Sequence, residues 1–164
     1  MTGRVLIDKQ SPEVFAAMKQ VVRTVRDAAE AAGIDRALLE LLNVRVSQIN
    51  GCEFCLDVHW RAAVAAGVTP QRLALLPAWR DSRLYDDRER AALEIAEAVT
   101  RTAGAHLDDE AYAKARAGLD DDETAVLVWA SITINAFNRV SILSRHTVPE
   151  RDAQGRTTAA GAQR

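Results

Sequence analysis

Apolar residues recur at helical spacing along most of this chain, and that periodicity limits its fold more than any other feature. Ser11, Pro12 and Glu13 supply a cap, a first-turn proline and an early acid for a helix that we expect over 12–32. Alternating apolar and polar residues occur only in a short strand candidate at 4–7. The sequence therefore predicts an all-α fold, a compact helical domain of about six helices.

The remaining helices can be placed by their caps and stops. Asp35 caps a helix that ends at Gly51, and the next helix begins at the cysteines and ends at Gly67. Further helices are expected from 69–70, over 87–102, after Asp108 or Asp109, and from 120 onward. The last of these is apolar nearly all round from 125 to 137, which predicts a central helix or one packed between subunits.

The composition fits one domain of a globular protein. Of 164 residues, 48% are hydrophobic and 27% are charged, so we expect a single domain over 1–150 with a flexible tail over 151–164. The net charge is -2, and the basic and acidic residues are interspersed along the chain, so the sequence indicates no basic patch for binding nucleic acid. No signal-peptide pattern and no uninterrupted apolar run of roughly 18 residues is present, so we expect a cytoplasmic protein without a membrane span.

The two cysteines of the chain, Cys52 and Cys55, stand in a C-x-x-C pattern, which indicates redox chemistry. With His59 they are spaced i, i+3 and i+7, so all three side chains share one helix face. His59 lies about 6 Å along the axis from Cys55 and about 10 Å from Cys52. Cys55 is therefore the better candidate for a base-activated thiolate. Cys52 is expected to be the accessible thiol at the helix start and to resolve a sulfenic acid on its neighbour.

Glu40 is the expected partner of His59. It precedes the Asn50–Gly51 turn by about ten residues and His59 follows that turn by about eight, so antiparallel helices would put the two side chains at similar heights. A carboxylate there would hold the imidazole tautomer and help to remove the thiol proton. His106 and His146 have no such relation to another group and are read as structural.

Glu40, eleven residues, and then Cys52-x-x-Cys55-x-x-x-His59 closely resemble the signature of alkylhydroperoxidase D-like (AhpD-like) proteins in the carboxymuconolactone decarboxylase superfamily. The segments QINGCEFC and RERAALEIAEAVT and the late stretch 134–139 extend the resemblance over most of the chain. Phe54 is a departure, because the best-studied members have a second histidine between the cysteines. Muconolactone-decarboxylating members lack the cysteine pair, so its presence argues against that reaction.

The resemblance implies an all-helical homo-oligomer (dimer, trimer or hexamer) that reduces hydroperoxides. It implies a peroxidatic role for Cys55, a resolving and reductant-facing role for Cys52, and proton relay by His59 and Glu40. No tightly bound cofactor or metal is expected. An external dithiol, such as a lipoyl group on a carrier or a thioredoxin-like protein, would restore the reduced pair.

Other interpretations remain open at this point. A thiol-disulfide oxidoreductase with little peroxidase activity would use the same disulfide, and a non-enzymatic redox sensor would use it to change its assembly. Two buried packing cysteines, or a zinc site on Cys52, Cys55 and His59, are simpler alternatives.

Overall fold

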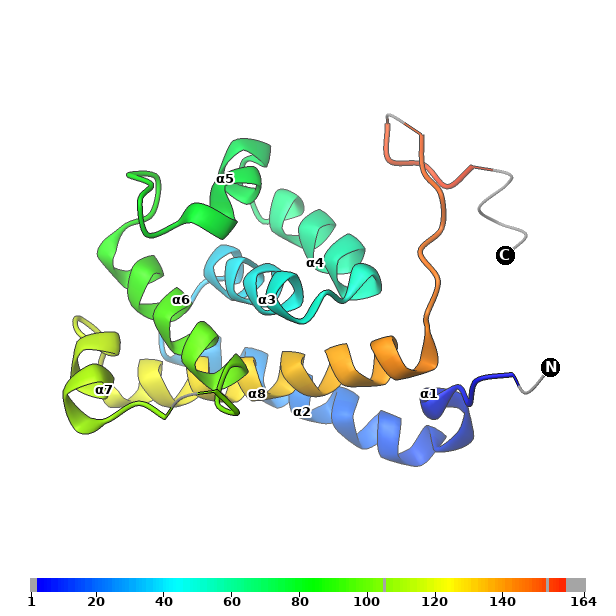
Figure 1. Ribbon diagram of the computed structural model, residues 1–164, viewed down its shortest axis with the longest axis horizontal. Coiled ribbons are helices and arrows are strands. Elements are labelled where there is room, and N and C mark those ends of the chain that lie inside the picture. The colour runs from blue at the N-terminus through cyan, green and yellow to red at the C-terminus, as the bar shows by residue number, and fades with distance from the viewer. Residues whose placement is uncertain (1–2, 105, 153, 159–164) are drawn as a thin grey trace.

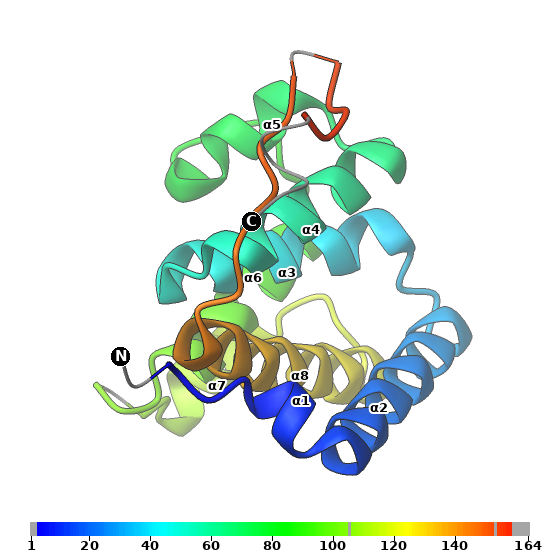
Figure 2. The same ribbon diagram turned by 90° about the vertical axis from the view of Figure 1, so that its right-hand side faces the viewer.

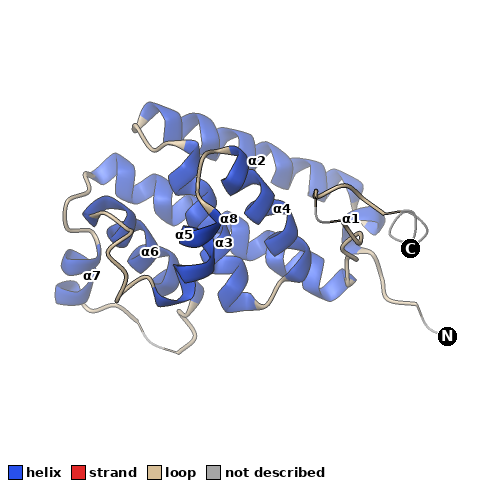
Figure 3. Ribbon diagram, turned by 90° about the horizontal axis from the view of Figure 1, so that it is seen from above, coloured by secondary structure: helices blue, strands red, loops and turns tan. Residues whose placement is uncertain are grey.

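The computed structural model describes residues 3–104, 106–152 and 154–158. Within these ranges the chain forms eight α-helices, one short 3-10 helix and no β-strand, which confirms the all-α prediction (Figure 3). The elements are α1 (Ile7–Gln10), α2 (Pro12–Ala31), α3 (Arg36–Asn50), α4 (Glu53–Ala65), α5 (Pro70–Leu75), η1 (Leu76–Ala78), α6 (Asp87–Thr100), α7 (Asp109–Ala115) and α8 (Asp121–Ser144).

The caps explain where these helices begin. Asp35 accepts a hydrogen bond from the Leu38 amide at 2.8 Å, and Asp108, rather than Asp109, caps α7. Asp86 and Asp120 each form a capping box with the glutamate three residues later, which fixes the starts of α6 and α8. The caps at Asp35 and Asp108 are therefore among those that the sequence predicts.

The helices pack as two layers. The long helices α2 and α8 lie together in one layer, and α3, α4 and α5 lie in the other (Figure 1, Figure 2). The centre of the fold is α3, which contacts α4, α6 and α8. Its Leu38, Leu42 and Val46 join the larger apolar cluster, whereas Leu41 and Val44 face the smaller one. A helix buried on both sides holds its side chains rigidly, which matters because α3 carries Glu40.

A buried ionic cluster joins α3 to α6. Glu97 of α6 is 2% exposed and accepts hydrogen bonds from Arg45 at 2.7 Å, Trp79 at 2.9 Å, Arg80 at 2.9 Å and Arg101 at 2.7 Å. Each oxygen of this carboxylate receives two donors, which offsets the cost of removing its charge from water.

The strand predicted at 4–7 is wrong. Residues 4–6 are irregular, and Ile7 begins the short helix α1, which was not anticipated and raises the helix count above the expected six. The Ile7 amide donates to Ser144 Oγ at 3.0 Å, so this segment is held by the end of α8. A four-residue helix has too little sequence to show a period, and its docking partner lies more than a hundred residues away.

Part of the predicted C-terminal tail makes contacts with the helical domain. Arg151 pairs with Asp57 of α4 at 3.3 Å and forms an isolated antiparallel bridge with Thr157. These contacts hold the first part of the segment against α4. Residues 153 and 159–164 of the predicted tail lie outside the described residues.

By length and composition alone, α8 could cross a membrane, since its mean hydropathy is 1.4. Its place in the fold gives another reason for that composition, because α8 packs against α2, α3 and α6. Ser131, Asn135 and Asn138 on this helix are buried and hydrogen-bonded within the protein, as expected of a core helix.

Candidate active site

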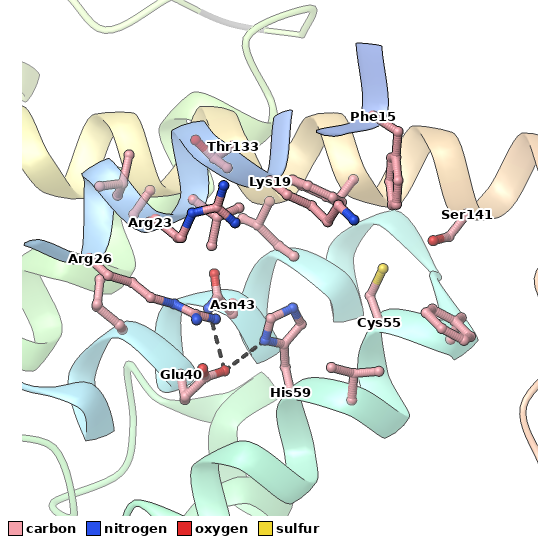
Figure 4. A pocket seen from close by; sticks show the side chains of 18 of the residues that line it. Phe15, Lys19, Arg23, Arg26, Glu40, Asn43, Cys55, His59, Thr133 and Ser141 are labelled. Carbon is pink, nitrogen blue, oxygen red and sulfur yellow. Dashed lines mark hydrogen bonds and ion pairs between the residues drawn. The ribbon is translucent and has the colours of Figure 1, made fainter. Parts of the chain in front are cut away.

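The four predicted site residues lie on α3 and α4. Cys52 is the N-cap residue of α4, Cys55 lies in its first turn, and His59 follows one turn later. Gly51 has a φ of 66°, a left-handed conformation that favours glycine, and there the chain turns from α3 into α4. The two helices pack side by side, so Glu40, His59 and Cys55 border one pocket (Figure 4).

The predicted contact between Glu40 and His59 is present. His59 Nδ1 lies 2.6 Å from Glu40 Oε2, and Asn43 donates to the same oxygen at 3.4 Å. Arg36 forms an ion pair with Oε1 at 2.5 Å. Burial would raise the pKa of Glu40, but the hydrogen bond from His59 and the charges of His59 and Arg36 outweigh it and lower that pKa. Glu40 thus engages one ring nitrogen of His59, and the other, Nε2, faces the pocket.

The two thiols are free and chemically unequal. The hydrogen bond from Cys52 lowers the pKa of Cys55 to about 6, against burial, and Ser141, Asn138 and the charge of His59 act in the same direction. The same hydrogen bond, together with burial, raises the pKa of Cys52. At neutral pH the pair therefore carries a thiolate on Cys55 and a proton on Cys52.

The prediction that Cys52 is the accessible thiol is wrong. Cys52 is 1% exposed and does not line the pocket, whereas Cys55, at 4% exposure, does. As the N-cap residue, Cys52 packs into the larger apolar cluster, and its sulfur lies within hydrogen-bonding reach of Ser141 on α8. A position at a helix start gives access to solvent only if no other element covers that end.

These contacts predict the titration of Cys55. We expect its thiolate, followed by ultraviolet absorbance or by alkylation rate, to form with a midpoint of about 6, so that reactivity rises with pH through that value. Cys52→Ala removes the largest favourable contact and should shift the midpoint upward toward that of an ordinary thiol. Cys55→Ala is the control and should abolish the transition. An unchanged midpoint in Cys52→Ala would contradict the assignment.

The pocket has a volume of about 530 Å³. It lies between α2 and α8 on one side and α3 and α4 on the other, and Asp8 and His146 complete one end. Most of its lining is apolar, with Cys55, His59 and Glu40 among the polar groups (Figure 4). A cavity of this size accommodates a small organic molecule beside the thiolate.

Sequence reasoning missed a group of polar residues at one end of this pocket. His146, which the sequence gives no partner, does have partners in the structure. Its Nε2 lies 3.0 Å from Asp8 Oδ1 and its Nδ1 lies 3.3 Å from Ser141 Oγ. Its ring packs edge-on against Phe54, with ring centroids 5.3 Å apart. Ser141 in turn faces Cys55 (Figure 4). These residues come from both ends of the chain, so no local spacing indicates them.

No group of three or more histidine, cysteine, aspartate or glutamate side chains in the described ranges is arranged to hold a metal ion. The contacts of Cys55 and His59 are instead with Cys52, Ser141 and Glu40.

Fold and site together define an all-helical protein with a buried dithiol beside a glutamate–histidine pair. The carboxymuconolactone decarboxylase family profile matches residues 12–98. The uncharacterized protein YdfG of Bacillus subtilis is 35% identical over 142 residues, which is 87% of this chain and 94% of YdfG. The chain therefore belongs to the carboxymuconolactone decarboxylase family, of which it is an AhpD-like member.

Two further comparisons support the AhpD-like assignment. A crystal structure of a protein of unknown function from Agrobacterium tumefaciens, related in its description to the antioxidant defence protein AhpD, superposes with a TM-score of 0.81 at 32% identity. The match covers 92% of this chain and all of that one. The alkyl hydroperoxide reductase AhpD of Rhodopseudomonas palustris is 49% identical over 37 residues, which is 23% of this chain and 20% of that protein. The family also includes decarboxylases, so membership defines the class of protein and leaves the reaction to the site.

Proposed function

We propose that this protein is a thiol-dependent hydroperoxide reductase. The observation that carries the proposal is Cys55, a thiol of lowered pKa that lines a pocket together with the paired side chains of His59 and Glu40. A thiolate at the wall of an apolar pocket is suited to attack the O–O bond of an organic hydroperoxide.

The proposed cycle has three steps: oxidation of Cys55 to a sulfenic acid, formation of the Cys52–Cys55 disulfide, and reduction of that disulfide. The Cys55 thiolate attacks the terminal peroxide oxygen, the O–O bond breaks, and the alkoxide takes a proton and leaves as an alcohol, so that Cys55 becomes a sulfenic acid. His59, held by Glu40, accepts the thiol proton and supplies the proton to the leaving oxygen. Cys52 then attacks the sulfenic sulfur, which forms the disulfide and releases water.

An external dithiol closes the cycle. Its first thiolate attacks the disulfide at Cys55, the sulfur at the pocket, and releases Cys52. Its second thiolate then forms the donor's own disulfide and releases Cys55. A lipoyl group, free or attached to a carrier protein, is a dithiol of the class that this step requires. The dithiol donor, the homo-oligomer and the cytoplasmic location stay predictions.

The test is the oxidation of dihydrolipoamide in the presence of cumene hydroperoxide. We expect turnover with the wild-type protein, and mass spectrometry after peroxide alone should show one intramolecular Cys52–Cys55 disulfide per chain. Thiols that stay unmodified under peroxide would overturn the proposal and favour two cysteines buried for packing.

The same disulfide would serve a thiol-disulfide oxidoreductase, and the burial of the pair distinguishes the two activities. A protein disulfide must bring its sulfur to the attacking thiol, whereas Cys55 is only 4% exposed and is reached through the pocket. We therefore expect faster reaction with small hydroperoxides than with protein disulfides. A redox sensor would instead show a change in elution volume between reduced and oxidised protein, without turnover.

A further inference from the structure

One wall of the pocket is positively charged. Lys19, Arg23 and Arg26 are spaced by four and three residues, so they share one face of α2. All three line the pocket, and their side chains extend toward the space that Cys55 and His59 border (Figure 4).

These three cations have no carboxylate partner in the described part of the chain. Arg23 donates to the neutral amide oxygen of Gln20 at 2.9 Å, and the Lys19 ammonium lies over the Phe15 ring at 5.4 Å from its centroid. Arg26 has neither kind of contact. Asp27 and Glu30 stand at i+4 from Arg23 and Arg26, a spacing at which a surface helix can pair opposite charges, but in the described structure they form no ion pair with these arginines.

The acids in the pocket are already engaged. Glu40 is paired with Arg36 and His59, and Asp8 is paired with His146. With Arg36, the pocket lining holds four cationic side chains against two carboxylates. The electrostatic potential there favours a negatively charged ligand.

The positive charge of Arg26 is destabilised by this arrangement. Partial burial and repulsion by Arg36 lower the pKa of Arg26, and the charge of Glu40 only partly opposes them. A ligand carboxylate beside Arg26 would supply the missing counter-charge. Arginine pairs with a planar carboxylate through two parallel hydrogen bonds, which a surface water cannot imitate.

The rest of the pocket suits a hydrocarbon. The apolar side chains that line the same pocket include Val22, Leu39, Val58, Ile134 and Phe137. A ligand that satisfies both parts is amphipathic, with one anionic end, an apolar body and a reactive group at Cys55.

We propose that the preferred substrate is an organic hydroperoxide that also carries a carboxylate, of the fatty-acid hydroperoxide type, whose carboxylate binds Arg23 and Arg26 while its peroxide meets Cys55. This inference rests on the proposed function. The carboxylate takes no part in the reaction, in which the hydroperoxide becomes an alcohol and Cys55 a sulfenic acid as above. Lys19 adds to the attraction of the anion.

The test compares a fatty-acid hydroperoxide with its methyl ester and with cumene hydroperoxide. In the wild-type protein we expect kcat/KM for the acid to exceed that for the ester by about tenfold, with the difference falling as salt is added. The double variant Arg23→Gln/Arg26→Gln should lose about tenfold on the acid and stay unchanged on the ester and on cumene hydroperoxide. The control is Arg83→Gln/Lys114→Gln, which removes two positive charges from exposed positions outside the pocket and should change none of the three.

A second measurement separates this inference from the proposed function. Binding of oleate, which carries no peroxide, is followed by calorimetry in the wild-type protein and in the double variant, with methyl oleate as the uncharged counterpart. Tighter binding of oleate than of its ester, weakened about tenfold by the double substitution, supports the anion site even if no hydroperoxide is turned over. Equal rates for acid and ester, or an equal loss on all substrates in the double variant, would overturn the inference and leave the peroxidase intact.

Discussion

Cys55→Ser is expected to reduce peroxide-dependent oxidation of a dithiol by on the order of a thousandfold or more, which is the scale of losing the nucleophile in other covalent catalysts. The hydroxyl of serine stays protonated under conditions in which the Cys55 pKa of about 6 gives a thiolate. The remaining thiol, Cys52, has a raised pKa and lies outside the pocket, so it cannot take over. Steady-state turnover with cumene hydroperoxide and dihydrolipoamide measures the loss.

The matched control for this prediction is Cys52→Ser. It should keep the first step and lose the second, so that one sulfenic acid accumulates on Cys55 and is trapped by dimedone, while multiple turnover stops. If Cys55→Ser instead accumulated a sulfenic acid on Cys52 and Cys52→Ser were inert to peroxide, the roles of the two thiols would be reversed.

Glu97→Gln is expected to cost about 3 kcal/mol of unfolding free energy at neutral pH, because it leaves the buried Arg45 without a full counter-charge. Hydrogen bonds from Trp79, Arg80 and Arg45 overcome burial and lower the pKa of Glu97 to about 2. A carboxylate with a depressed pKa stabilises the fold above its unfolded value, near 4.5, and loses that contribution as the pH falls toward 2.

Urea denaturation at several pH values tests this prediction. The difference between wild-type and Glu97→Gln protein should be full at pH values above about 5, and it should shrink progressively between about 4.5 and 2. Glu94→Gln is the control. Within the described residues Glu94, one turn earlier on α6, forms an ion pair with Arg80 alone, at 2.7 Å and at a more exposed position, so its loss should stay within about 0.5 kcal/mol. Equal losses in both variants would show that the buried cluster is not the source of stability.

The part of the site that the sequence predicts is the part made by adjacent helices. Glu40 and His59 meet because one glycine turn joins two helices of similar length, and local geometry then sets their heights. The spacing of Cys55 and His59 on one helix face needs no tertiary information at all.

The remainder depends on how distant elements dock. Helical spacing puts Cys52 at a helix start, but it cannot indicate that Ser141 of α8 lies close to that start. For this reason the predicted accessibility of Cys52 is wrong. His146 lines the pocket and contacts Asp8, a residue 138 positions earlier in the chain. Contacts of this kind follow from packing between layers, for which a single sequence carries no local signal.

The contacts of Cys55 with α8 have a consequence for the order in which the chain matures. During synthesis α4 and its thiols emerge long before Asn138 and Ser141, so the nascent chain lacks two of the contacts that lower the pKa of Cys55. The full lowering of the Cys55 pKa would therefore be reached only when α8 docks onto α4.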